Sequence, residues 1–521
     1  MKFKLCILAA GRGTRNQSIE GLHKCLLPVA NKPVISHILD RFSKDTSIVI
    51  ALGWKSDQIK SYLDKVHSDR DITYVQVDNY DKPGSGPGYS LLACKSHLQC
   101  PFIFTASDTI IDEDKFENSV SQNWVGGSKV SEDESFRYCL MKTDDKNRFK
   151  GFYYGSGGAY CFTGIAGVLN YKRFWESLSN SHKINGEHQV INGFDGLKDI
   201  VIRDHKFYDT GNEMSYRETK KVLPNNLAVE KDNEAIFIDN KYVIKYFSEV
   251  NKCSNRIKRY EQIINCTPKV CKINDNMFCY NYVPGRNLSK VQDDKILKYF
   301  FKDYQKQFRN KILEFDNNIF RENCIKMYKE KTQQRIKSFV NSPVDRIKYV
   351  NGIKVGTIAE MISKINWEDI FEKAIPSRFH GDMQPENIIV DGQKFTYIDW
   401  RESFGNSISV GDAYYDLGKC YHALLISNEL ILSGNYDLKI TEKSAELSFC
   451  LKNNLNKLMN HLEAFCLEEG YDYSHVKLIG VINYLNIASL YKNFDGGKYG
   501  NFLFLLGKMM LSELFCDNEL D

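Results

Sequence analysis

The chain has 521 residues, of which 42% are hydrophobic and 26% charged, so it is expected to fold into more than one globular domain. Its 70 basic and 66 acidic residues nearly cancel, and without a basic tail or stripe a nucleic-acid partner is not expected. No apolar run approaches the roughly 18 residues that span a membrane, so no membrane partner is expected. The 15 cysteines include no CxxC pair, which favours reduced thiols in a cytoplasmic protein.

Short apolar runs alternate with amphipathic stretches over residues 1–220. The apolar runs are typical of buried strands, and the amphipathic stretches have helical spacing. Strand, helix and strand at this spacing predict parallel βαβ units in an α/β, doubly wound, Rossmann-like domain. The expected strands are Leu5–Ala10, Ser47–Gly53, Ile72–Val77 and Pro101–Ala106, and the expected helices are Val34–Phe42, Asp57–Val66 and Tyr89–His97.

A glycine loop follows the first expected strand, in the segment Leu8-Ala9-Ala10-Gly11-Arg12-Gly13-Thr14-Arg15. A dinucleotide fingerprint does not fit because Asn16 stands where its third glycine belongs, and a P-loop does not fit because no Gly-Lys-Ser/Thr closes the segment. Gly11 and Gly13 would let the backbone approach a nucleotide, with its N–H groups on phosphate oxygens. Lys24-Cys25-Leu26-Leu27-Pro28 and Asn31-Lys32-Pro33 come next.

This combination resembles the signature of the sugar-nucleotide and phosphocholine nucleotidyltransferases, a MobA-like NTP transferase family, over roughly residues 3–220. The resemblance implies that the nucleotide is bound by Ala10, Gly11, Gly13 and Thr14. It also implies that Arg15 and Lys24 are catalytic and supply positive charge at the α-phosphorus as pyrophosphate leaves. Residues 16–22 are then expected to form a mobile flap over the triphosphate.

Two aspartates are the expected metal ligands of this domain. Asp108 follows the strand Pro101–Ala106, at the carboxyl edge where open α/β sheets bind ligands. Asp209, in Phe207-Tyr208-Asp209-Thr210-Gly211, resembles a second aspartate of the family. Together they would hold Mg²⁺ against the α-phosphate. Gly84 and Gly86 stand where the family recognises the base, and a plain surface turn is the alternative.

From residue 221 the pattern changes to short strands followed by long helical stretches. Ala235–Ile238 and Lys241–Phe247 are expected strands around an Asp239-Asn240 turn. Later elements are a basic helix at Asn255–Ile264, a strand ending in Tyr280–Gly285, and strands at Asn387–Val390 and Phe395–Asp399. Residues 293–375 are expected to be mostly helical, and the chain beyond Gly411 is expected to be helical to its end. This order is typical of a two-lobed, protein-kinase-like α+β domain, here over residues 221–521.

The motif His380-Gly381-Asp382-Met383-Gln384-Pro385-Glu386-Asn387 is followed by Ile398-Asp399-Trp400. Its spacing matches the catalytic loop of protein-kinase-like folds, and the whole resembles the aminoglycoside phosphotransferase and choline kinase superfamily. The resemblance implies that Asp382 is the catalytic base for a substrate hydroxyl. It also implies that Asn387 and Asp399 hold Mg²⁺ against the phosphates of ATP.

Three further residues are candidates for ATP binding. Lys245 looks like the strand lysine that grips the α- and β-phosphates, although Lys241 on the same strand face leaves a solvated charge as the alternative. Glu261 is the candidate partner of Lys245, and Tyr282 lies in a segment that resembles the hinge where adenine stacks. Asp416 is expected to order the catalytic loop.

Aromatic residues gather around this second motif. Together with acidic side chains they could enclose a quaternary ammonium group, as aromatic cages do. An aromatic helical core is the other interpretation. The residues concerned are Trp400, Tyr414, Tyr415, Tyr421, Tyr484, Tyr491 and Phe494.

The two patterns together predict a bifunctional enzyme that needs Mg²⁺. It would phosphorylate a small alcohol, amino-alcohol or sugar with ATP, and then transfer a nucleotidyl group, from CTP by preference, to the phosphomonoester. Such NDP-linked products are precursors for surface-polysaccharide decoration. One alternative is a sugar kinase joined to a sugar-phosphate uridylyl- or guanylyltransferase, and another is a degenerate domain that regulates its neighbour. The sequence leaves the oligomeric state open.

Overall fold

The computed structural model describes residues 2–112, 118–144, 148–157, 160–184, 186–225, 231–309 and 314–517. The chain forms two compact units. Unit 1 comprises residues 1–249 and 272–279, and unit 2 comprises residues 250–271 and 280–521.

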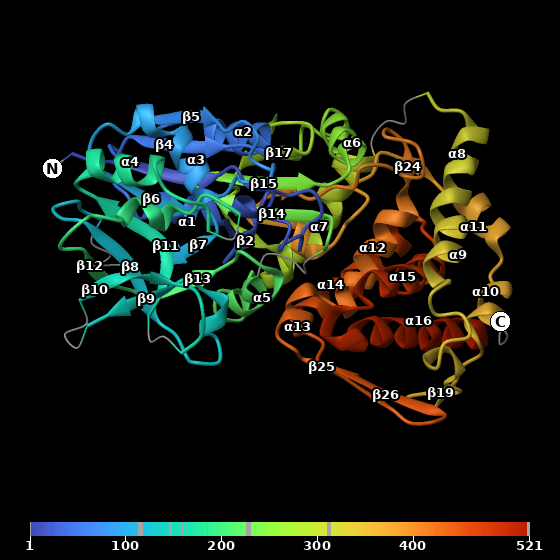
Figure 1. Ribbon diagram of the computed structural model, residues 1–521. Helices are drawn as coiled ribbons and strands as arrows, with labels where there is room; N and C mark the ends of the chain where they lie inside the picture. Colours follow the sequence, from blue (N-terminus) through green and yellow to red (C-terminus); the bar gives the residue numbers. More distant parts are fainter. Residues whose placement is uncertain are drawn as a thin grey trace. The chain divides into compact units, whose positions relative to one another are not determined.

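Unit 1 is built on a nine-stranded mixed sheet in the order β10-β9-β11-β6-β1-β4-β5, with β8 beside β11 and β12 beside β8 (Figure 1). Its central strand β1 pairs in parallel with β4 and with β6, and β4 pairs in parallel with β5, which confirms the four predicted strands. The strands are β1 (Lys4–Ala9), β4 (Ile48–Leu52), β5 (Ile72–Gln76), β6 (Phe102–Ala106), β8 (Trp124–Lys129), β9 (Leu140–Thr143), β10 (Phe149–Tyr153), β11 (Tyr160–Val168) and β12 (Val201–Asp204).

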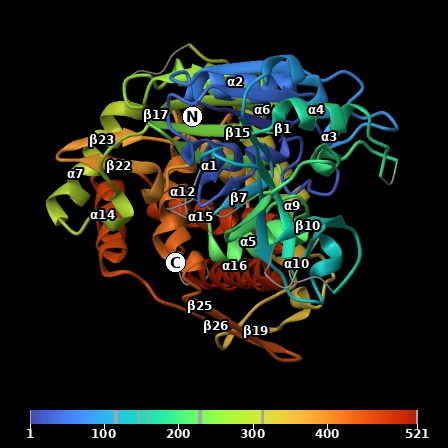
Figure 2. The same cartoon turned by 60° about the vertical axis from the view of Figure 1, so that its left-hand side comes forward.

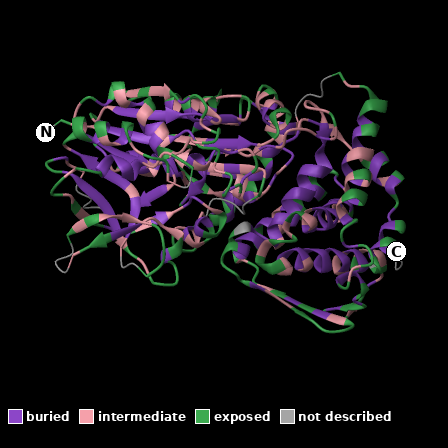
Figure 3. Cartoon of the chain, viewed as in Figure 1, coloured by how far each residue is buried: buried purple, intermediate pink, exposed green. Residues whose placement is uncertain are grey.

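Helices cover both faces of this sheet, as a doubly wound fold requires. Side chains alternate along β1, so that Leu5 and Ile7 join one core and Cys6 joins the other. The first core includes residues of α1 (Val34–Asp40) and α2 (Ser56–Val66), and the second includes residues of α3 (Pro87–Ala93) and α4 (Tyr171–Ser179). Because both faces are buried, β1, β4 and β6 are almost continuously apolar (Figure 3).

A second, four-stranded sheet, in the order β14-β15-β17-β16, contributes β14, β15 and most of β17 to unit 1. Its strands are β14 (Glu234–Asp239), β15 (Tyr242–Phe247), β16 (Val270–Lys272) and β17 (Met277–Asn281). The expected hairpin is present, and Asn240 has the positive φ of 50° that such a two-residue turn requires. Phe237 and Ile244 share the core of α1 and α2, with the Phe237 ring edge-on to Tyr62 at 5.9 Å. The compact units therefore divide after Glu249, whereas the sequence suggests a boundary at 220/221.

A buried carboxylate fastens this hairpin to α2. Asp239, at the end of β14, is 2% exposed. It accepts a hydrogen bond from the Tyr62 hydroxyl at 2.7 Å, and it lies 3.0 Å from His67 Nε2 and 3.4 Å from Lys32 Nζ. Although burial alone raises the pKa of Asp239, the hydrogen bonds that it accepts, led by that from His67, hold the pKa below its usual range.

Unit 2 contains small sheets and most of the helices. A three-stranded sheet joins β18 (Arg286–Asn287), β22 (Ile388–Asp391) and β23 (Lys394–Tyr397), the last two as a hairpin (Figure 2). The helices are α6 (Val250–Tyr260), α7 (Asp294–Tyr304), α8 (Asn317–Cys324), α9 (Lys331–Ile336), α10 (Ile358–Ser363), α11 (Trp367–Lys373), α12 (Ala413–Leu425), α13 (Asn428–Leu432), α14 (Asn453–Glu469), α15 (Tyr473–Ala488) and α16 (Lys498–Asp517). Across the described part of the chain, no helix combines the length and apolarity needed to cross a bilayer.

The expectation of uninterrupted helix beyond Gly411 is wrong. A hairpin of β25 (Tyr436–Ile440) and β26 (Ser444–Phe449) lies between α13 and α14. Ala445 and Leu447 are buried while Glu446 and Ser448 are exposed, so the segment has the two-residue period of a strand. It is completed by β19 (Tyr349–Val350) and β20 (Ile353–Lys354) into one four-stranded sheet.

We expect Asp239→Ala to destabilise unit 1 by about 3–5 kcal/mol, because removal of one partner leaves buried polar groups unpaired. Urea-induced unfolding, read by hydrogen exchange in α2 and β14, measures the loss. The folded-state pKa of Asp239 is lowered, so its contribution is present above the unfolded pKa of about 3.9 and is lost as the pH falls below it. Asp69→Ala, which removes an exposed partner of Lys44, is the control and should cause no measurable change.

Two candidate active sites

The first site forms where β1 and β6 end in unit 1. Lys24 Nζ lies 2.6 Å from Asp108 Oδ2, and both side chains are largely buried. Gly13 makes this contact possible. Its φ is +63°, and a Cβ atom there would lie 3.0 Å from Lys24 Cδ, so a larger residue would obstruct the lysine. Gly13 thus leaves room for the Lys24 side chain, which pairs with Asp108.

The two expected metal ligands come together in the structure. The strand β7 (Thr109–Ile111) starts directly after Asp108 and pairs antiparallel with β13 (Phe207–Asp209), with Asp209 opposite Thr109. A Cβ atom on Gly211 would lie 3.0 Å from Asp108 Oδ2 and 3.1 Å from Asp209 Oδ1, so the glycine leaves room for both carboxylates. Sequence segments 100 residues apart are joined by this short ladder.

The two carboxylates differ in their electrostatics. Burial raises the pKa of Asp108, but Lys24 and Arg15 outweigh it and hold that pKa below its usual value. Burial and the neighbouring Asp108 charge raise the pKa of Asp209. Hard carboxylate oxygens held this close suit a divalent cation such as Mg²⁺. Among the described residues no group of three or more His, Cys, Asp or Glu could hold a metal, so phosphate oxygens and water would complete its coordination.

The glycine loop has a support that the motif does not reveal. His23 is fully buried, its Nε2 lies 3.2 Å from the Gly11 carbonyl oxygen, and its Nδ1 accepts the Cys25 N–H. Burial lowers the pKa of His23 to about 3, so the neutral ring donates to Gly11. Gly11 itself borders open space, since a Cβ atom there would meet nothing within 4 Å in the described structure.

The remaining loop residues divide into buried and exposed positions. Ala10 is 1% exposed and accepts the Trp54 N–H, while Thr14 and Arg15 are exposed. The expected flap is not seen. The Asn16 side chain donates to the Thr210 carbonyl at 2.7 Å, and Ile19 and Leu22 are buried in the core, so the segment is packed into unit 1.

Gly84 and Gly86 pack against a later segment of unit 1. Both have positive φ, and a Cβ atom on Gly86 would lie 2.7 Å from the His188 carbonyl oxygen. One on Gly84 would meet the Lys183 ammonium group. The glycines therefore allow close packing against Lys183, Glu187 and His188, and Gly86 is the N-cap residue of α3. A role in base recognition stays a prediction.

The second site forms at one end of the β22–β23 hairpin in unit 2. Because Ile388 pairs with Tyr397, the residues that flank the hairpin, Asn387 and Asp399, leave it at the same end. Asn387 Nδ2 donates to the Asp382 carbonyl at 2.9 Å and lies 3.3 Å from its carboxylate. The Ile398 N–H donates to the Asn387 carbonyl at 2.8 Å. The three expected residues of the motif are thus held in one hydrogen-bonded loop.

A buried aspartate orders this loop, as the sequence suggests. Asp416 of α12 accepts the N–H groups of His380 at 2.7 Å and Gly381 at 2.6 Å. Burial raises the pKa of Asp416 to about 7. His380 is also fully buried, and burial lowers its pKa to about 4, so the neutral ring bonds to the Ile398 carbonyl and accepts the Asp382 N–H.

The helix α6 contacts the site through arginine. Arg256 Nη1 lies 2.8 Å from Asp399 Oδ1 and 2.6 Å from the Trp400 carbonyl oxygen. Arg259 is fully buried and donates to three backbone carbonyls of the loop region. Glu261, the expected acidic residue, follows the end of α6 in an exposed turn. Helix α6 ends at Tyr260, one residue too early to carry it.

The other expected ATP contacts have clear positions in their own units. Lys245 lies in β15 of unit 1 and is 3% exposed, so the alternative of a solvated charge does not hold. Tyr282 follows β17 in unit 2 and is 53% exposed. Their roles in binding ATP stay predictions.

Sequence reasoning missed Lys419, which lies 2.9 Å from Asp382 Oδ1 and is only 7% exposed. Burial alone raises the pKa of Asp382, but Lys419 holds it well below the usual range. Lys419 comes three residues after Asp416 in α12, and therefore on the same face of that helix. That spacing is the signal that could have identified it.

The aromatic side chains near this motif pack and bond within the core. Trp400 is 1% exposed and donates to the Arg256 carbonyl, and Tyr484 is fully buried and donates to the His422 carbonyl. Tyr414 stacks edge-on to His475 at 4.5 Å, and its hydroxyl accepts the Asp472 N–H. Tyr491 packs against Tyr499. The interpretation as an aromatic core therefore fits Trp400, Tyr414 and Tyr484, whereas Tyr491 is only half-buried.

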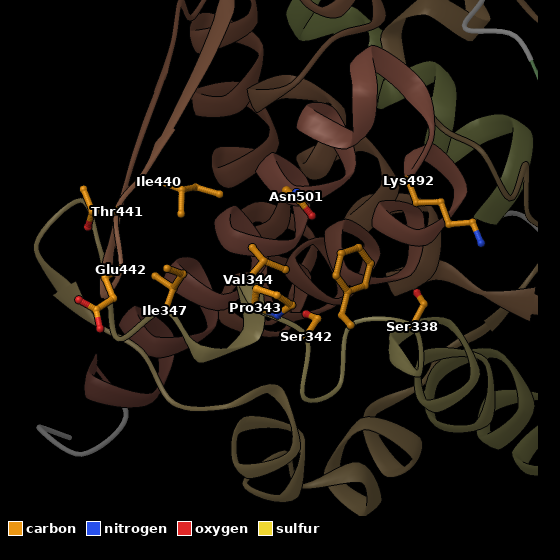
Figure 4. A pocket seen from close by; sticks show the side chains of 11 residues that line it. Ser338, Ser342, Pro343, Val344, Ile347, Ile440, Thr441, Glu442, Lys492 and Asn501 are labelled. Carbon is orange, nitrogen blue, oxygen red and sulfur yellow. The ribbon is translucent and has the colours of Figure 1, made fainter.

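A separate pocket of unit 2 contains none of the expected site residues. It has a volume of about 470 Å³ (Figure 4). It is lined by Ser338, Phe339, Ser342, Pro343, Val344, Ile347, Ile440, Thr441, Glu442, Lys492 and Asn501.

Part of the chain that contains most of the first site matches a known family. Residues 5–122 match the family described as the MobA-like NTP transferase domain. The N-terminal part of the chain is a MobA-like NTP transferase domain. All four strands predicted for the parallel core, together with Lys24 and Asp108, lie within the matched residues.

Curated relatives share parts of their length with this chain. "Bifunctional protein GlmU" of Methanococcus vannielii is 28% identical over 142 residues, which are 27% of this chain and 33% of that protein. "Bifunctional IPC transferase and DIPP synthase" of Archaeoglobus fulgidus is 32% identical over 118 residues, 22% of each. The chain thus spans about a third or less of these relatives.

Solved structures with some similarity include the CTP:phosphocholine cytidylyltransferase LicC of Streptococcus pneumoniae. It is 18% identical, with 43% of this chain and all of that chain covered at a TM-score of 0.35. HddC of Yersinia pseudotuberculosis is 20% identical, with 42% and 99% covered at a TM-score of 0.33.

We expect Gly13→Ala to destabilise the loop by about 1–2 kcal/mol, because alanine at this φ is strained and would press on Lys24. Hydrogen exchange of peptides that cover β1 and residues 10–27 measures the effect. Gly11→Ala is the matched control, with free space for its methyl group and a change below about 0.5 kcal/mol. Equal protection in both variants would contradict the role given to Gly13.

Proposed function

We propose that the chain is a bifunctional enzyme, with a nucleotidyltransferase in its N-terminal part and a small-molecule kinase in its C-terminal part. The kinase would phosphorylate a small alcohol, amino-alcohol or sugar with ATP. The transferase would join the resulting phosphomonoester to a nucleotide, giving an NDP-linked product and pyrophosphate. The observation that carries the proposal is the grouping of Asp382, Asn387 and Asp399 in a chain that also holds an NTP transferase domain.

The nucleotidyl transfer is supported by Lys24, Arg15 and the carboxylate pair. A phosphate oxygen of the acceptor would attack the α-phosphorus of the NTP, and the bond to the β-phosphate would break as pyrophosphate leaves. Lys24 and Arg15 would stabilise the negative charge that develops. Asp108 and Asp209 would hold Mg²⁺, which neutralises phosphate charge when bound.

The phosphoryl transfer is supported by the ionised state of Asp382. Its carboxylate would accept a hydrogen bond from the acceptor hydroxyl and then its proton, as the hydroxyl oxygen bonds to the γ-phosphorus and ADP leaves. Asn387 and Asp399 would hold Mg²⁺ with ATP. The hydrogen bond between Arg256 and Asp399 would have to break first. Little covalent chemistry is asked of the protein, so positioning of these groups is sufficient.

CTP is the nucleotide that we propose, on the resemblance to phosphocholine nucleotidyltransferases, with UTP or GTP and a sugar phosphate as the second candidate. The second candidate gains support from the aromatic side chains, because three rings proposed for a choline cage, those of Trp400, Tyr414 and Tyr484, are buried in the core. We place both reactions in the cytoplasm, where ATP and CTP are available. A role in surface-polysaccharide decoration would follow from an NDP-linked product.

The overall proposal is tested with purified full-length chain, ATP, each NTP in turn, and a panel of alcohols and sugars, with products read by mass spectrometry. An NDP-linked product that forms from a free alcohol supports both activities. Formation only from a supplied phosphomonoester would reduce the proposal to the transferase, with the second unit in a regulatory role.

Asp108→Ala is expected to abolish NTP-dependent pyrophosphate release and to leave ATP-dependent phosphorylation near normal. The variant removes a carboxylate from the pair and leaves Lys24 without its partner. Asp112→Asn, a nearby aspartate bonded to Tyr208, is the matched control and should keep both activities. Loss of both activities in a folded Asp108→Ala protein would count against two separate sites.

Asp382→Asn is expected to lower kinase turnover by about a hundredfold or more, the contribution of a positioned general base. Supplied phosphomonoester should still be converted by the transferase. Asp391→Asn, at the other end of the same hairpin, is the control. Wild-type phosphorylation by Asp382→Asn would remove this residue from the mechanism.

A further inference from the structure

Basic side chains gather next to Asp382 on two facing helices of unit 2. Lys331 and Arg335 are one turn apart on α9, and Tyr415 and Lys419 are one turn apart on α12. Lys331 Nζ lies 3.4 Å from the Tyr415 hydroxyl, which joins the two faces. Lys419 extends the group to Asp382.

The positive charge of this cluster is only partly balanced. In the described part of the chain, Lys419 pairs with Asp382 and Arg401 pairs with Glu402 at 3.6 Å, while Glu402 also serves Arg256. Neither Lys331 nor Arg335 forms an ion pair with a described residue. Among the described residues, two basic groups are thus left without an acidic partner in a cluster that reaches Asp382 through Lys419.

The positive charges of the cluster lower the pKa values of Lys331 and Arg335. Burial lowers the pKa of Lys331 well below its ordinary value, and the charges of Arg401, Lys419 and Arg335 lower it further. Burial and Arg401 also lower the pKa of Arg335. A bound anion would reverse these effects, since an opposite charge nearby favours the charged form of a lysine. A bound anion would therefore stabilise the charged forms of Lys331 and Arg335.

The backbone before Lys331 is also irregular. Residues Ile325–Glu330 form a π-helical turn between α8 and α9, so that the helix is locally widened. Such turns cost stability and occur frequently at functional sites. This one ends where Lys331 begins α9.

We propose that the kinase acceptor is an anionic alcohol, with a carboxylate or phosphate group that binds Lys331 and Arg335 while its hydroxyl faces Asp382. This inference rests on the proposed kinase function and narrows its substrate class. A cationic acceptor such as choline would meet repulsion from the same side chains, and the aromatic rings that could have offset it are packed in the core.

The test compares acceptors that differ mainly in charge. One series is glycerate, glycerol and serinol, and the other is glucuronate, glucose and glucosamine, each with ATP and full-length protein. We expect the anionic member of at least one series to have the highest kcat/KM, by about tenfold or more over the neutral one, and its KM to rise with ionic strength. Phosphorylation of a neutral or cationic member equally well or better would overturn the inference and leave the kinase function standing.

Variants then locate the anion. Lys331→Met and Arg335→Gln should each raise the KM for the anionic acceptor about tenfold and leave the KM for ATP unchanged, whereas the exposed Lys337→Met should change neither. An increase in the KM for ATP alone would assign the cluster to the ATP phosphates and overturn the inference. If no alcohol receives phosphate while nucleotidyl transfer proceeds, the proposed kinase function fails, and the inference fails with it.

Discussion

A carboxylate removed from water loses several kcal/mol of solvation unless cations or N–H and O–H donors replace the water. Both units are organised around carboxylates that meet this requirement. Asp239 joins the second sheet of unit 1 to α2, and Asp416 fixes the loop that carries Asp382. Without these buried acceptors, neither the hairpin nor the loop would have a fixed position.

Asp416 differs in its partners from the carboxylates that are proposed to take part in the reactions. Asp416 accepts hydrogen bonds from two backbone N–H groups, which cannot move away without unfolding the loop. Asp108 and Asp382 instead form ion pairs with lysine, and Asp399 forms one with arginine. A long side chain can leave its partner when a phosphate or a cation arrives, so these carboxylates are both stable without ligand and available to it.

The sequence predicted most of what the motifs contain and little of what surrounds them. Asp108 with Asp209, and Asn387 with Asp399, come together because each of these four residues lies at a strand end, and strand ends are visible in the pattern. Asp382 lies in the loop before β22, where the Asn387 side chain donates to its carbonyl. Lys419, Lys331 and His23 were missed because a packed partner leaves no motif. Glu261 was expected in a helix, but α6 ends one residue before it. The unit boundary could not be predicted, because the alternation of side chains in β14 and β15 shows that one face is buried but not which core covers it.

The second sheet of unit 1 has a consequence for biosynthesis. The parts of this sheet that belong to unit 1 come from residues 234–247 and from the separate stretch 272–279, so unit 1 is discontinuous in the chain. The apolar surface around Phe237 is only completed by Met277 and Cys279 of β17. A ribosome that has released the whole MobA-like domain has therefore not yet released all of its core. A fragment that contains all of this core must extend to Cys279, so a gene fragment ending at residue 220 would leave apolar surface of α2 uncovered.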